Sequence, residues 1–458
     1  MDKKGRKKGI VFLVTALALL LPWLAEDARA DEVSNLKEQL KVQTQLLQQM
    51  QGRLEQLEAT QKLKEKSLRQ EIEQPAQKKP EMGPTDFRVF WKEGLNFATQ
   101  DGSFKLKVGG RLMNDWLWIG EDKDIKANVG EQEDGVEFRR ARLDFSGLIY
   151  DNVEYRVELD FAGGDADFKD VYLGLTDFPL GSLRMGHFKE PFSLEELTSS
   201  RHITFLERAL PNVFVPSRNT GVMLRGTALA ASDPRMTWAV GVFRDTDDYG
   251  ENVDDGGYNI TGRVTALPIY QDGGAHLLHV GAAYSYRNPD DAVRYRQTPE
   301  AHLTDRFVDT GTFASDQVDL FGLEAAWVSG PLSVQSEYVS ANADVASSAD
   351  FDGYYVQASY FLTGEHRNYK TSEAAFDRVK PKENYSFSRS PGAWEVAARY
   401  SELDLDDGNI GGGKLKNITA GLNWYLNPNT KIMWNYVHAH KDDVGDADLF
   451  MVRLQFDF

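Results

Sequence analysis

A period-two alternation of apolar and polar residues runs from about residue 104 to the C-terminus and constrains this chain more than any other feature. In residues 152–161, Val153, Tyr155 and Val157 share one face, whereas Glu154 and Arg156 share the other. This is the period of a β-strand, whose successive side chains point to opposite faces of a sheet. Sixteen strands are predicted, at 104–118, 136–150, 152–162, 168–177, 181–187, 220–229, 235–244, 258–268, 276–287, 316–329, 331–341, 352–363, 392–402, 415–426, 429–440 and 447–458.

A soluble sandwich and a membrane-spanning barrel would both alternate in this way. The barrel is favoured because an even number of antiparallel strands closes with both chain ends on one side, and because short and long connections alternate. The mean hydropathy of -0.47 is compatible with a barrel, in which only every second strand residue faces lipid. We therefore predict an all-β fold, a 16-stranded antiparallel transmembrane β-barrel over residues 104–458.

Long connections are expected at 119–135, 188–219, 245–257, 288–315 and 403–414. One of these, and one further connection that should be short, stand out. The segment 188–219 is irregular, contains prolines and carries charges of both signs, so we interpret it as a loop folded into the mouth of the barrel. The segment 364–391 should be a short turn by strand parity, yet it has 28 residues. It is either a periplasmic excursion or a sign that the strand count differs by one there.

The N-terminal region is organised differently. Basic residues before an apolar run at 10–21, followed by Ala28-Arg29-Ala30, predict a signal peptide over residues 1–30. Residues 31–74 are predicted to form a helical coiled-coil stalk, and 75–103 a proline-containing linker with a possible short strand or plug segment at 87–97. The stalk rests on three- and four-residue steps through Val33, Leu36, Leu40, Gln43, Leu47, Met50, Leu54 and Leu57. The alternative is a solvated amphipathic helix resting on its own domain.

Several function classes are disfavoured by composition and motifs. The chain has no cysteine, which excludes a disulfide framework and a thiol nucleophile, and its net charge of -18 argues against nucleic-acid binding. The stretch GNIGGGKL at 408–415 resembles a phosphate-binding loop, but Leu415 stands where a metal-binding Ser or Thr is needed. No catalytic triad or metal-ligand pattern is evident, so we predict no enzyme, cofactor or metal site.

The charges predicted to face the inside of the barrel are mixed. Strand parity directs ten cations inward, and it directs several carboxylates inward as well. This mixture is compatible with two interpretations, an anion-preferring pore and a general channel. The inward cations are Lys105, Lys107, Arg111, Arg140, Arg142, Arg156, Arg225, Arg263, Arg399 and Arg453, and the inward carboxylates include Glu154, Glu158, Asp160, Glu337 and Glu395.

Six segments resemble a known family, the phosphate- and pyrophosphate-selective porins of the outer-membrane porin O and P type. They are DGSFKLKVGGRL at 101–112, FRRARLDFSG at 138–147, FSLEELTSSRHITFLER at 192–208, YFLTGEHRNYK at 360–370, GAWEVAARYSELDLDD at 392–407 and GLNWYLN at 421–427. The resemblance covers 85–458 and leaves out the signal peptide and the coiled coil. It implies a trimer of sixteen-stranded barrels, in which the third outer loop folds into the lumen.

The resemblance also implies roles for individual residues in the constriction. It assigns such roles to Arg111, Arg139, Arg140, Asp170, Ser199, Ser200 and Arg208, and Arg201 stands at a position that is also basic in the phosphate-selective members. Glu196 replaces a phosphate-contacting lysine of the family, and Arg142 and Lys189 replace two aromatic residues at the narrowest point. A carboxylate there would repel phosphate, while Arg142 and Lys189 would pair with it or add an anion contact.

We therefore predict a trimeric outer-membrane porin for passive diffusion of small hydrophilic solutes, above all anions such as phosphate or polyphosphate. One alternative is a general or weakly cation-selective porin, and another is a structural envelope tether acting through the coiled coil. The expected partners are a homotrimer, outer-membrane lipid and lipopolysaccharide, small anionic solutes, and a cell-wall or periplasmic partner of the coiled coil, without nucleic acid.

Overall fold

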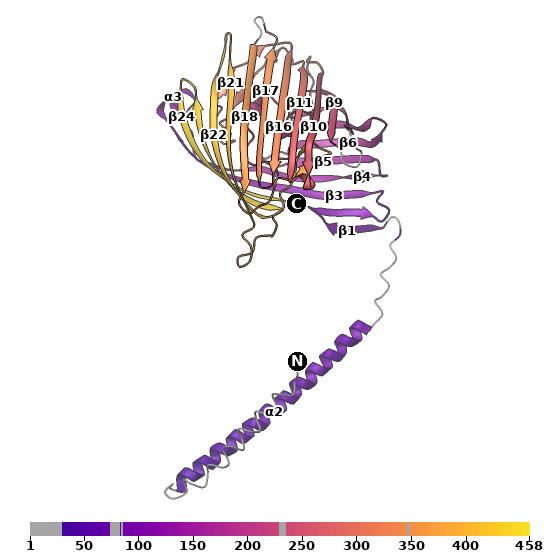
Figure 1. The fold of residues 1–458 in the computed structure, drawn as a ribbon, viewed down its shortest axis with the longest axis vertical. Coiled ribbons are helices and arrows are strands. Elements are labelled where there is room, and N and C mark those ends of the chain that lie inside the picture. Colours follow the sequence, from indigo (N-terminus) through magenta and orange to yellow (C-terminus); the bar gives the residue numbers. More distant parts are fainter. Residues whose placement is uncertain (1–29, 74–82, 84–85, 229–234, 346–348) are drawn as a thin grey trace. The chain divides into compact units, whose positions relative to one another are not determined.

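A computed structural model describes residues 30–73, 83, 86–228, 235–345 and 349–458 (Figure 1). The chain divides into two compact units, Met1–Glu81 and Met82–Phe458, which we describe separately. Apart from Ala30, the predicted signal peptide lies outside the described residues, and so does nearly all of the predicted linker up to Pro84.

The first unit contains one long helix, α2 (Ala30–Glu73). Its predicted apolar row is largely open to solvent, with Leu47, Met50, Leu54 and Leu57 between 57% and 68% exposed. No helix in the described parts of the chain is long and apolar enough to cross a membrane.

The second unit is built on one large antiparallel sheet. Its eighteen strands comprise two short ones, β1 (Phe87–Trp91) and β2 (Leu95–Thr99), and sixteen long ones that follow each other in chain order. The long strands are β3 (Lys105–Glu121), β4 (Gly135–Ile149), β5 (Val153–Asp160), β6 (Asp167–Phe178), β7 (Gly181–Lys189), β8 (Arg218–Ala228), β9 (Met236–Arg244), β10 (Asn259–Gln271), β11 (His276–Arg287), β16 (Val318–Ser329), β17 (Leu332–Ala343), β18 (Ala349–Phe361), β21 (Ala393–Asp407), β22 (Ile410–Asn427), β23 (Thr430–Lys441) and β24 (Gly445–Asp457).

The sheet closes because the last strand, β24, pairs with the first long strand, β3, in register from Ala447↔Glu121 to Asp457↔Arg111. Beyond that point, β3 pairs with β2 (Leu95–Thr99), which in turn pairs with β1 (Phe87–Trp91). The possible short strand at 87–97 is therefore a hairpin beside the closed ring. Gly109 permits the close approach of the chain end, since a Cβ there would lie 2.7 Å from the carbonyl oxygen of Phe458.

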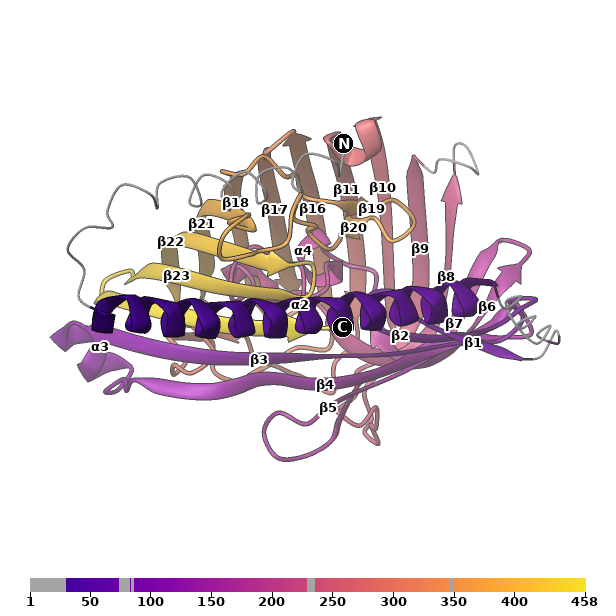
Figure 2. The same ribbon diagram turned by 90° about the horizontal axis from the view of Figure 1, so that it is seen from below.

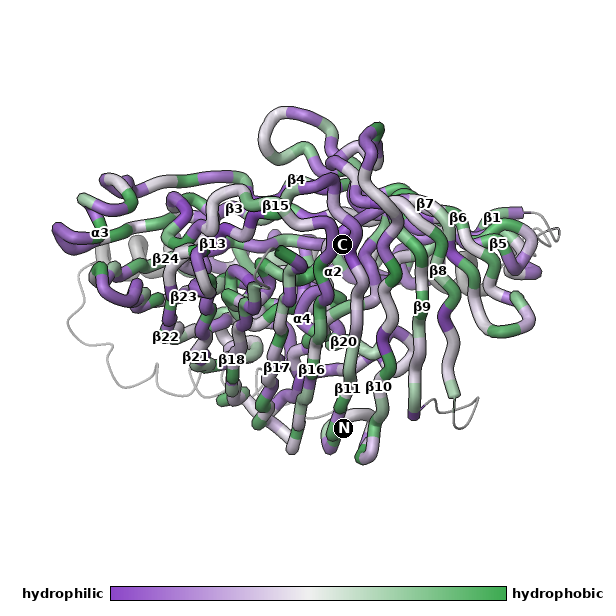
Figure 3. Tube along the Cα trace, turned by 90° about the horizontal axis from the view of Figure 1, so that it is seen from above, coloured by the Kyte–Doolittle hydropathy of each residue, from purple (hydrophilic) through white to green (hydrophobic). Residues whose placement is uncertain are grey.

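The predicted sixteen-stranded antiparallel barrel is confirmed, and its faces are those of a membrane barrel. On β3, the apolar Leu112, Trp116 and Trp118 are 43–45% exposed, whereas Arg111 and Asp115 are buried. Figure 3 shows the corresponding alternation of hydrophilic and hydrophobic residues along the strands. A soluble sandwich would bury the apolar face instead, so the outer surface is suited to lipid and the inner one to water.

The connections at the two ends of the barrel differ in length. We call the end with turns such as 150–152 and 179–180 the short-turn end, and the opposite one the long-loop end. The long connection predicted at 403–414 is wrong: β21 and β22 extend to Asp407 and Ile410, because the alternation of buried Leu403 and Leu405 continues past a bulge between Asp404 and Asp406. The strand count holds at 364–391, where a long segment, 362–392, joins β18 to β21 at the short-turn end.

Three connecting segments pack against inner faces of the strands. They are 190–217, with helix α4 (Leu194–Leu197) and 3₁₀ helix η1 (Leu210–Val213); 288–317, with β12 (Ala292–Val293), β13 (Arg296–Gln297), β14 (Val308–Asp309) and β15 (Phe313–Ala314); and 362–392, with β19 (Tyr369–Lys370) and β20 (Ala375–Phe376) (Figure 2). Further short helices are α3 (Lys123–Asn128) and η2 (Asp272–Gly274).

The segment 190–217 illustrates how these connections are held. The amide nitrogens of Leu194 and Glu195 donate to the Glu337 carboxylate on β17 at 2.9 and 2.8 Å. On another wall, Lys431 of β23 donates to the carbonyl oxygen of Ile203 at 3.1 Å. The segment therefore contacts inner faces of widely separated strands. It is shorter than the predicted 188–219, because Lys189 and Arg218 pair as the last residues of the β7–β8 ladder.

Candidate functional site

Eight of the eleven predicted site residues line a single cavity of about 120 Å³ inside the ring. Its walls carry seven cationic side chains and only two carboxylates, together with two serines and a leucine. The lining consists of Arg111, Arg140, Arg142, Arg156, Glu158, Asp170, Lys189, Leu197, Ser199, Ser200, Arg208 and Arg218.

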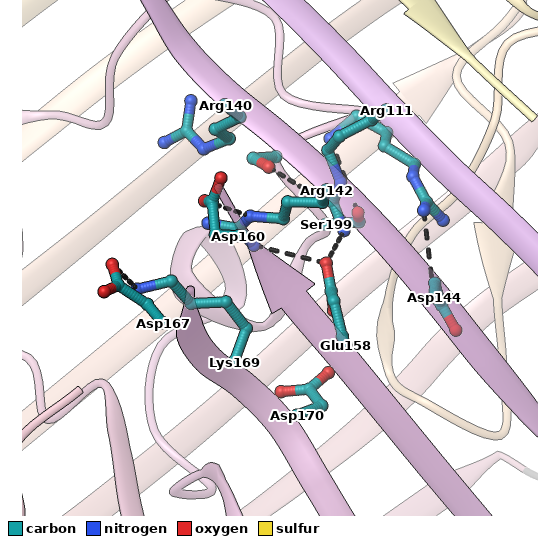
Figure 4. A network of polar contacts seen from close by, with 12 residues as sticks. Arg111, Arg140, Arg142, Asp144, Glu158, Asp160, Asp167, Lys169, Asp170 and Ser199 are labelled. Carbon is teal, nitrogen blue, oxygen red and sulfur yellow. Dashed lines mark hydrogen bonds and ion pairs between the residues drawn. The ribbon is translucent and has the colours of Figure 1, made fainter. Parts of the chain in front are cut away.

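Glu158 of β5 lies at the centre of the cationic group (Figure 4). It is fully buried and pairs with Arg111, with Arg142 at 3.3 Å and with Arg156 at 2.9 Å. These side chains meet because β3, β4 and β5 are adjacent and Arg111 lies opposite Arg142, which lies opposite Asp160. Two of these guanidiniums have further partners that Glu158 does not supply: Arg142 pairs with Asp160 and Arg156 with Asp144, each at 2.6 Å.

A β-bulge on β4 brings two consecutive arginines to the same side. Met113 pairs with Arg140 and Asn114 with Phe138, so Arg139 is an extra residue without a partner in the β3–β4 ladder. Arg139 then forms a two-pronged contact with Glu207 at 2.9 and 3.1 Å, and Arg140 lies 3.9 Å from the same carboxylate. Bulges redirect side chains in this way. The alternation of inward and outward residues along β4 therefore does not predict where the Arg139 side chain points.

Asp170 is placed by a second irregularity, on β6, where the register with β5 shifts between Val157 and Leu159. Its carboxylate accepts from Arg218 at 2.7 Å and pairs with Arg156 at 3.0 Å. Arg156 therefore bridges Asp170 and Glu158, the two carboxylates of the lining. Arg218 begins β8, so the cavity draws side chains from β3 to β8 and from the segment 190–217.

The segment 190–217 contributes Ser199, Ser200 and Arg208 to the lining. Arg111 donates to the Ser200 hydroxyl at 2.6 Å. Arg201 lies outside the lining, 3.7 Å from Asp144, and among the described residues nothing accepts a hydrogen bond from its buried Nε or Nη2.

Glu196 does not line the cavity either, and it is 2% exposed. Its carboxylate pairs with Lys189 at 2.9 Å and Arg208 at 3.0 Å. Burial would raise the pKa of Glu196, but Arg208 and Lys189 more than offset this and lower it to about 2. The predicted pairing of Lys189 with Glu196 is present in the structure, whereas Arg142 pairs with Asp160 and Glu158 instead.

The structure adds lining residues that were absent from the predicted site. Arg156 and Glu158 face inward by parity, so their alternation is a signal that could have selected them. Arg218 begins β8 and Leu197 ends α4, and their placement depends on contacts that a local pattern does not specify. Of the predicted residues, Arg139, Glu196 and Arg201 remain outside the lining and contact residues around it.

A larger cavity of about 450 Å³ adjoins the first one. The two share Arg156, Asp170, Lys189 and Leu197 in their linings. The larger cavity extends to Gly181 and Thr227, near the short-turn ends of β7 and β8, and is bordered by Ser372 and Glu373 of the segment 362–392. No group of three or more His, Asp or Glu side chains in the described parts of the chain is arranged to hold a metal ion.

These observations define the class of protein: a closed barrel that is apolar outside and polar inside, with charged cavities in its lumen, is an outer-membrane porin. The family model "Phosphate-selective porin O and P" matches residues 107–458, and the chain belongs to this family, which confirms the resemblance. Porin O of Pseudomonas aeruginosa is 31% identical over 420 residues, covering 81% of this chain and 93% of Porin O.

Two solved structures share the fold. The outer membrane channel DcaP of Acinetobacter baumannii superposes with a TM-score of 0.50 at 14% identity, covering 79% of this chain and 99% of that one. OmpF of Salmonella typhi, in complex with daunomycin, gives a TM-score of 0.50 at 15% identity, covering 81% and 100%. Family and fold are those of an outer-membrane channel.

Proposed function

We propose that this protein is a trimeric porin for passive diffusion of small anions across the outer membrane, with phosphate or polyphosphate as the leading solutes. The observation that carries the proposal is the excess of seven cationic side chains over two carboxylates in the 120 Å³ cavity. Guanidiniums recognise phosphate and carboxylate oxygens through pairs of N–H donors, and a file of them transfers an anion from site to site.

The segment 190–217 acts in this proposal as the outer loop that constricts the pore. Its Ser199, Ser200 and Arg208 provide hydroxyl and guanidinium donors next to Arg111 of the barrel wall. Glu196 does not oppose anion entry, because its charge is already matched by Lys189 and Arg208. Glu196, Asp160 and Glu207 pair with lining cations from outside the lining, so cationic groups outnumber carboxylates at the surface that faces the cavity.

A less selective or weakly cation-selective porin is the second candidate. Glu158 and Asp170 lie in the same lining as the arginines, and a narrow pore with both signs of charge passes both kinds of ion. Reversal potentials of the purified protein in planar bilayers under a KCl gradient distinguish the two. We expect an anion-selective potential and a chloride current that phosphate blocks; a cation-selective potential would contradict the proposal.

Helix α2 serves in this proposal as a periplasmic coiled coil that joins three chains, while the barrel contacts outer-membrane lipid and lipopolysaccharide. The exposed Leu47, Met50, Leu54 and Leu57 support it, because such a row is buried when helices pair. Deleting residues 31–74 should abolish trimers in native gels. Intact trimers together with weaker envelope attachment would favour a tether to the cell wall or to a periplasmic partner.

A further inference from the structure

The larger cavity contains an ion pair that crosses from the barrel wall to a connecting segment. Arg225 of β8 donates to Glu373 at 2.6 and 3.4 Å. Glu373 lies at the tip of the hairpin formed by β19 and β20, between Lys370 and Ala375. Both residues line the 450 Å³ cavity, which adjoins the cations of the 120 Å³ cavity, called here the arginine cluster. The pair therefore stands beside the route from the arginine cluster to the short-turn end.

Arg225 lies near the short-turn end of that route. It follows Arg218 on the same strand by seven residues, or about 23 Å at the usual rise of a β-strand, and lies three residues before β8 ends at Ala228. An anion that leaves the arginine cluster toward the short-turn end therefore meets Arg225 shortly before it leaves the barrel. In the structure, the guanidinium of Arg225 is already paired with the carboxylate of Glu373.

The hairpin that carries Glu373 is held independently of that ion pair. Arg263 donates to the carbonyl oxygen of Ala374 at 2.9 Å, and Arg367 donates to Gln335 at 2.9 Å. The amide nitrogen of Phe376 donates to the Thr198 hydroxyl at 3.3 Å. Release of Glu373 from Arg225 would therefore move one side chain and leave the hairpin in place.

The Arg225–Glu373 pair is more exposed to solvent than the neighbouring Arg263–Glu324 pair. The side chains of Arg225 and Glu373 are 23% and 36% exposed, whereas those of Arg263 and Glu324, which pair at 2.6 Å, are 5% and 3% exposed. Ion pairs in contact with water contribute about 0–1 kcal/mol and exchange readily, while a buried pair cannot be opened without stranding a charge. Among the two pairs, only the first is accessible to an anion in the cavity.

We propose that Arg225 is a second anion-binding site of the pore, at which a phosphate or carboxylate group of the solute replaces the carboxylate of Glu373. This inference rests on the proposed anion-conducting function. One anion enters as one carboxylate leaves, so the guanidinium is never left without a counter-ion. The displaced carboxylate keeps a partner, since Lys370 lies 3.5 Å from Glu373.

The ionisation of Glu373 fits an exchange between two anions. Burial would raise its pKa, but Arg225 and Lys370 lower it to about 2, so the carboxylate is charged at neutral pH. Glu373 thus competes with the solute for Arg225 and keeps the affinity of the second site low. Low affinity at an exit site favours release, because conduction requires that an anion leave as easily as it enters.

The test is block of chloride current by inorganic phosphate, added to each side of the bilayer in turn. Glu373→Gln should strengthen block from one side by about fivefold, the factor that corresponds to an exposed ion pair. Arg225→Gln should remove this site, and the double variant should match Arg225→Gln. Glu383→Gln is the matched control, because it makes the same charge change at an exposed position of the same segment.

The outcomes separate the two proposals. If Glu373→Gln and Arg225→Gln raise conductance alike and leave phosphate block unchanged, the hairpin is a steric element and the second site does not exist. The same conclusion follows if Glu383→Gln acts like Glu373→Gln. A cation-selective wild-type pore would overturn the proposed function itself, and with it this inference. Glu373→Gln removes no cation and changes an exposed side chain, so it remains informative if Arg225→Gln folds poorly.

Discussion

The two halves of the barrel lumen carry similar inward-facing charges, but these charges differ in how far they are enclosed. Beside β16–β24 the charges are enclosed: Arg399 pairs with Glu300 at 2.5 Å and with Glu195 at 3.3 Å, all three being buried. Beside β3–β10 the cations outnumber the carboxylates around two adjoining cavities. We call these the filled half and the open half.

The difference arises from the connecting segments and not from the strands. In the filled half, segments 190–217 and 288–317 bring carboxylates and apolar groups such as Leu206 and Phe307 against the wall. Helix α4 lies at the boundary between the two halves, and two consecutive residues of it face opposite halves. Glu195 pairs with Arg399 of the filled half, and Glu196 pairs with Lys189 and Arg208 of the open half. Alternation thus determines which charges face inward, and the segments determine which of them remain available to a solute.

The largest expected effect is on stability in the filled half. Arg399→Met strands Glu300 and Glu195 in buried surroundings, and such a loss costs about 3–5 kcal/mol. Urea unfolding in lipid vesicles measures it. Lys416→Met is the control, because the side chains of Lys416 and Asp442 are 33% and 26% exposed and their pair contributes about 0–1 kcal/mol. Equal losses in the two variants would contradict the distinction between enclosed and accessible charges.

The next effect is on anion affinity in the open half. Arg140 lines the cavity and lies 3.9 Å from the Glu207 carboxylate, so Arg140→Gln removes a weakly paired cation. We expect phosphate block to weaken about tenfold, equivalent to roughly 1.4 kcal/mol. Arg139→Gln makes the same charge change at a residue outside the lining and should alter block by less than about threefold, because its charge lies farther from the solute. A stronger effect of Arg139→Gln would place the anion beside Glu207.

Sequence reasoning predicted the barrel because alternation survives along each strand whatever the strand packs against. It also selected Arg111, Arg142 and Lys189, which line the cavity. It did not predict that β21 and β22 extend to Asp407 and Ile410, because turn-forming residues are tolerated at a bulge. A local pattern also contains no information on partners distant in the chain.

The partners of Glu196 show that second limit. The family resemblance suggests a carboxylate facing the pore, but Arg208, twelve residues away, and Lys189, at the end of β7, enclose it. The contact of Arg139 with Glu207 likewise depends on a bulge that shifts register by one residue. Such positions follow from the fold as a whole.

A smaller effect is expected from changing the two carboxylates of α4. Glu196→Gln frees Lys189 and Arg208 at the edge of the cavity, so phosphate block should strengthen by about threefold to fivefold, equivalent to roughly 0.6–1 kcal/mol. Glu195→Gln makes the same change toward the filled half, where Arg399 retains Glu300, and should leave block unchanged. Equal effects of the two substitutions would mean that α4 does not separate the halves.

The last effect concerns the pH dependence of stability. The pKa of Glu196 is about 2 in the folded protein against an ordinary value of 4.5, since Arg208 and Lys189 outweigh its burial. A lowered pKa stabilises the fold fully above 4.5, and this contribution is lost as pH falls from 4.5 toward 2. The difference in urea midpoint between the natural protein and Glu196→Gln should therefore narrow as pH falls below 4.5. A difference that instead stays constant down to pH 3 would show that Arg208 and Lys189 do not hold the carboxylate ionised, and the pairing of α4 with the open half would be contradicted.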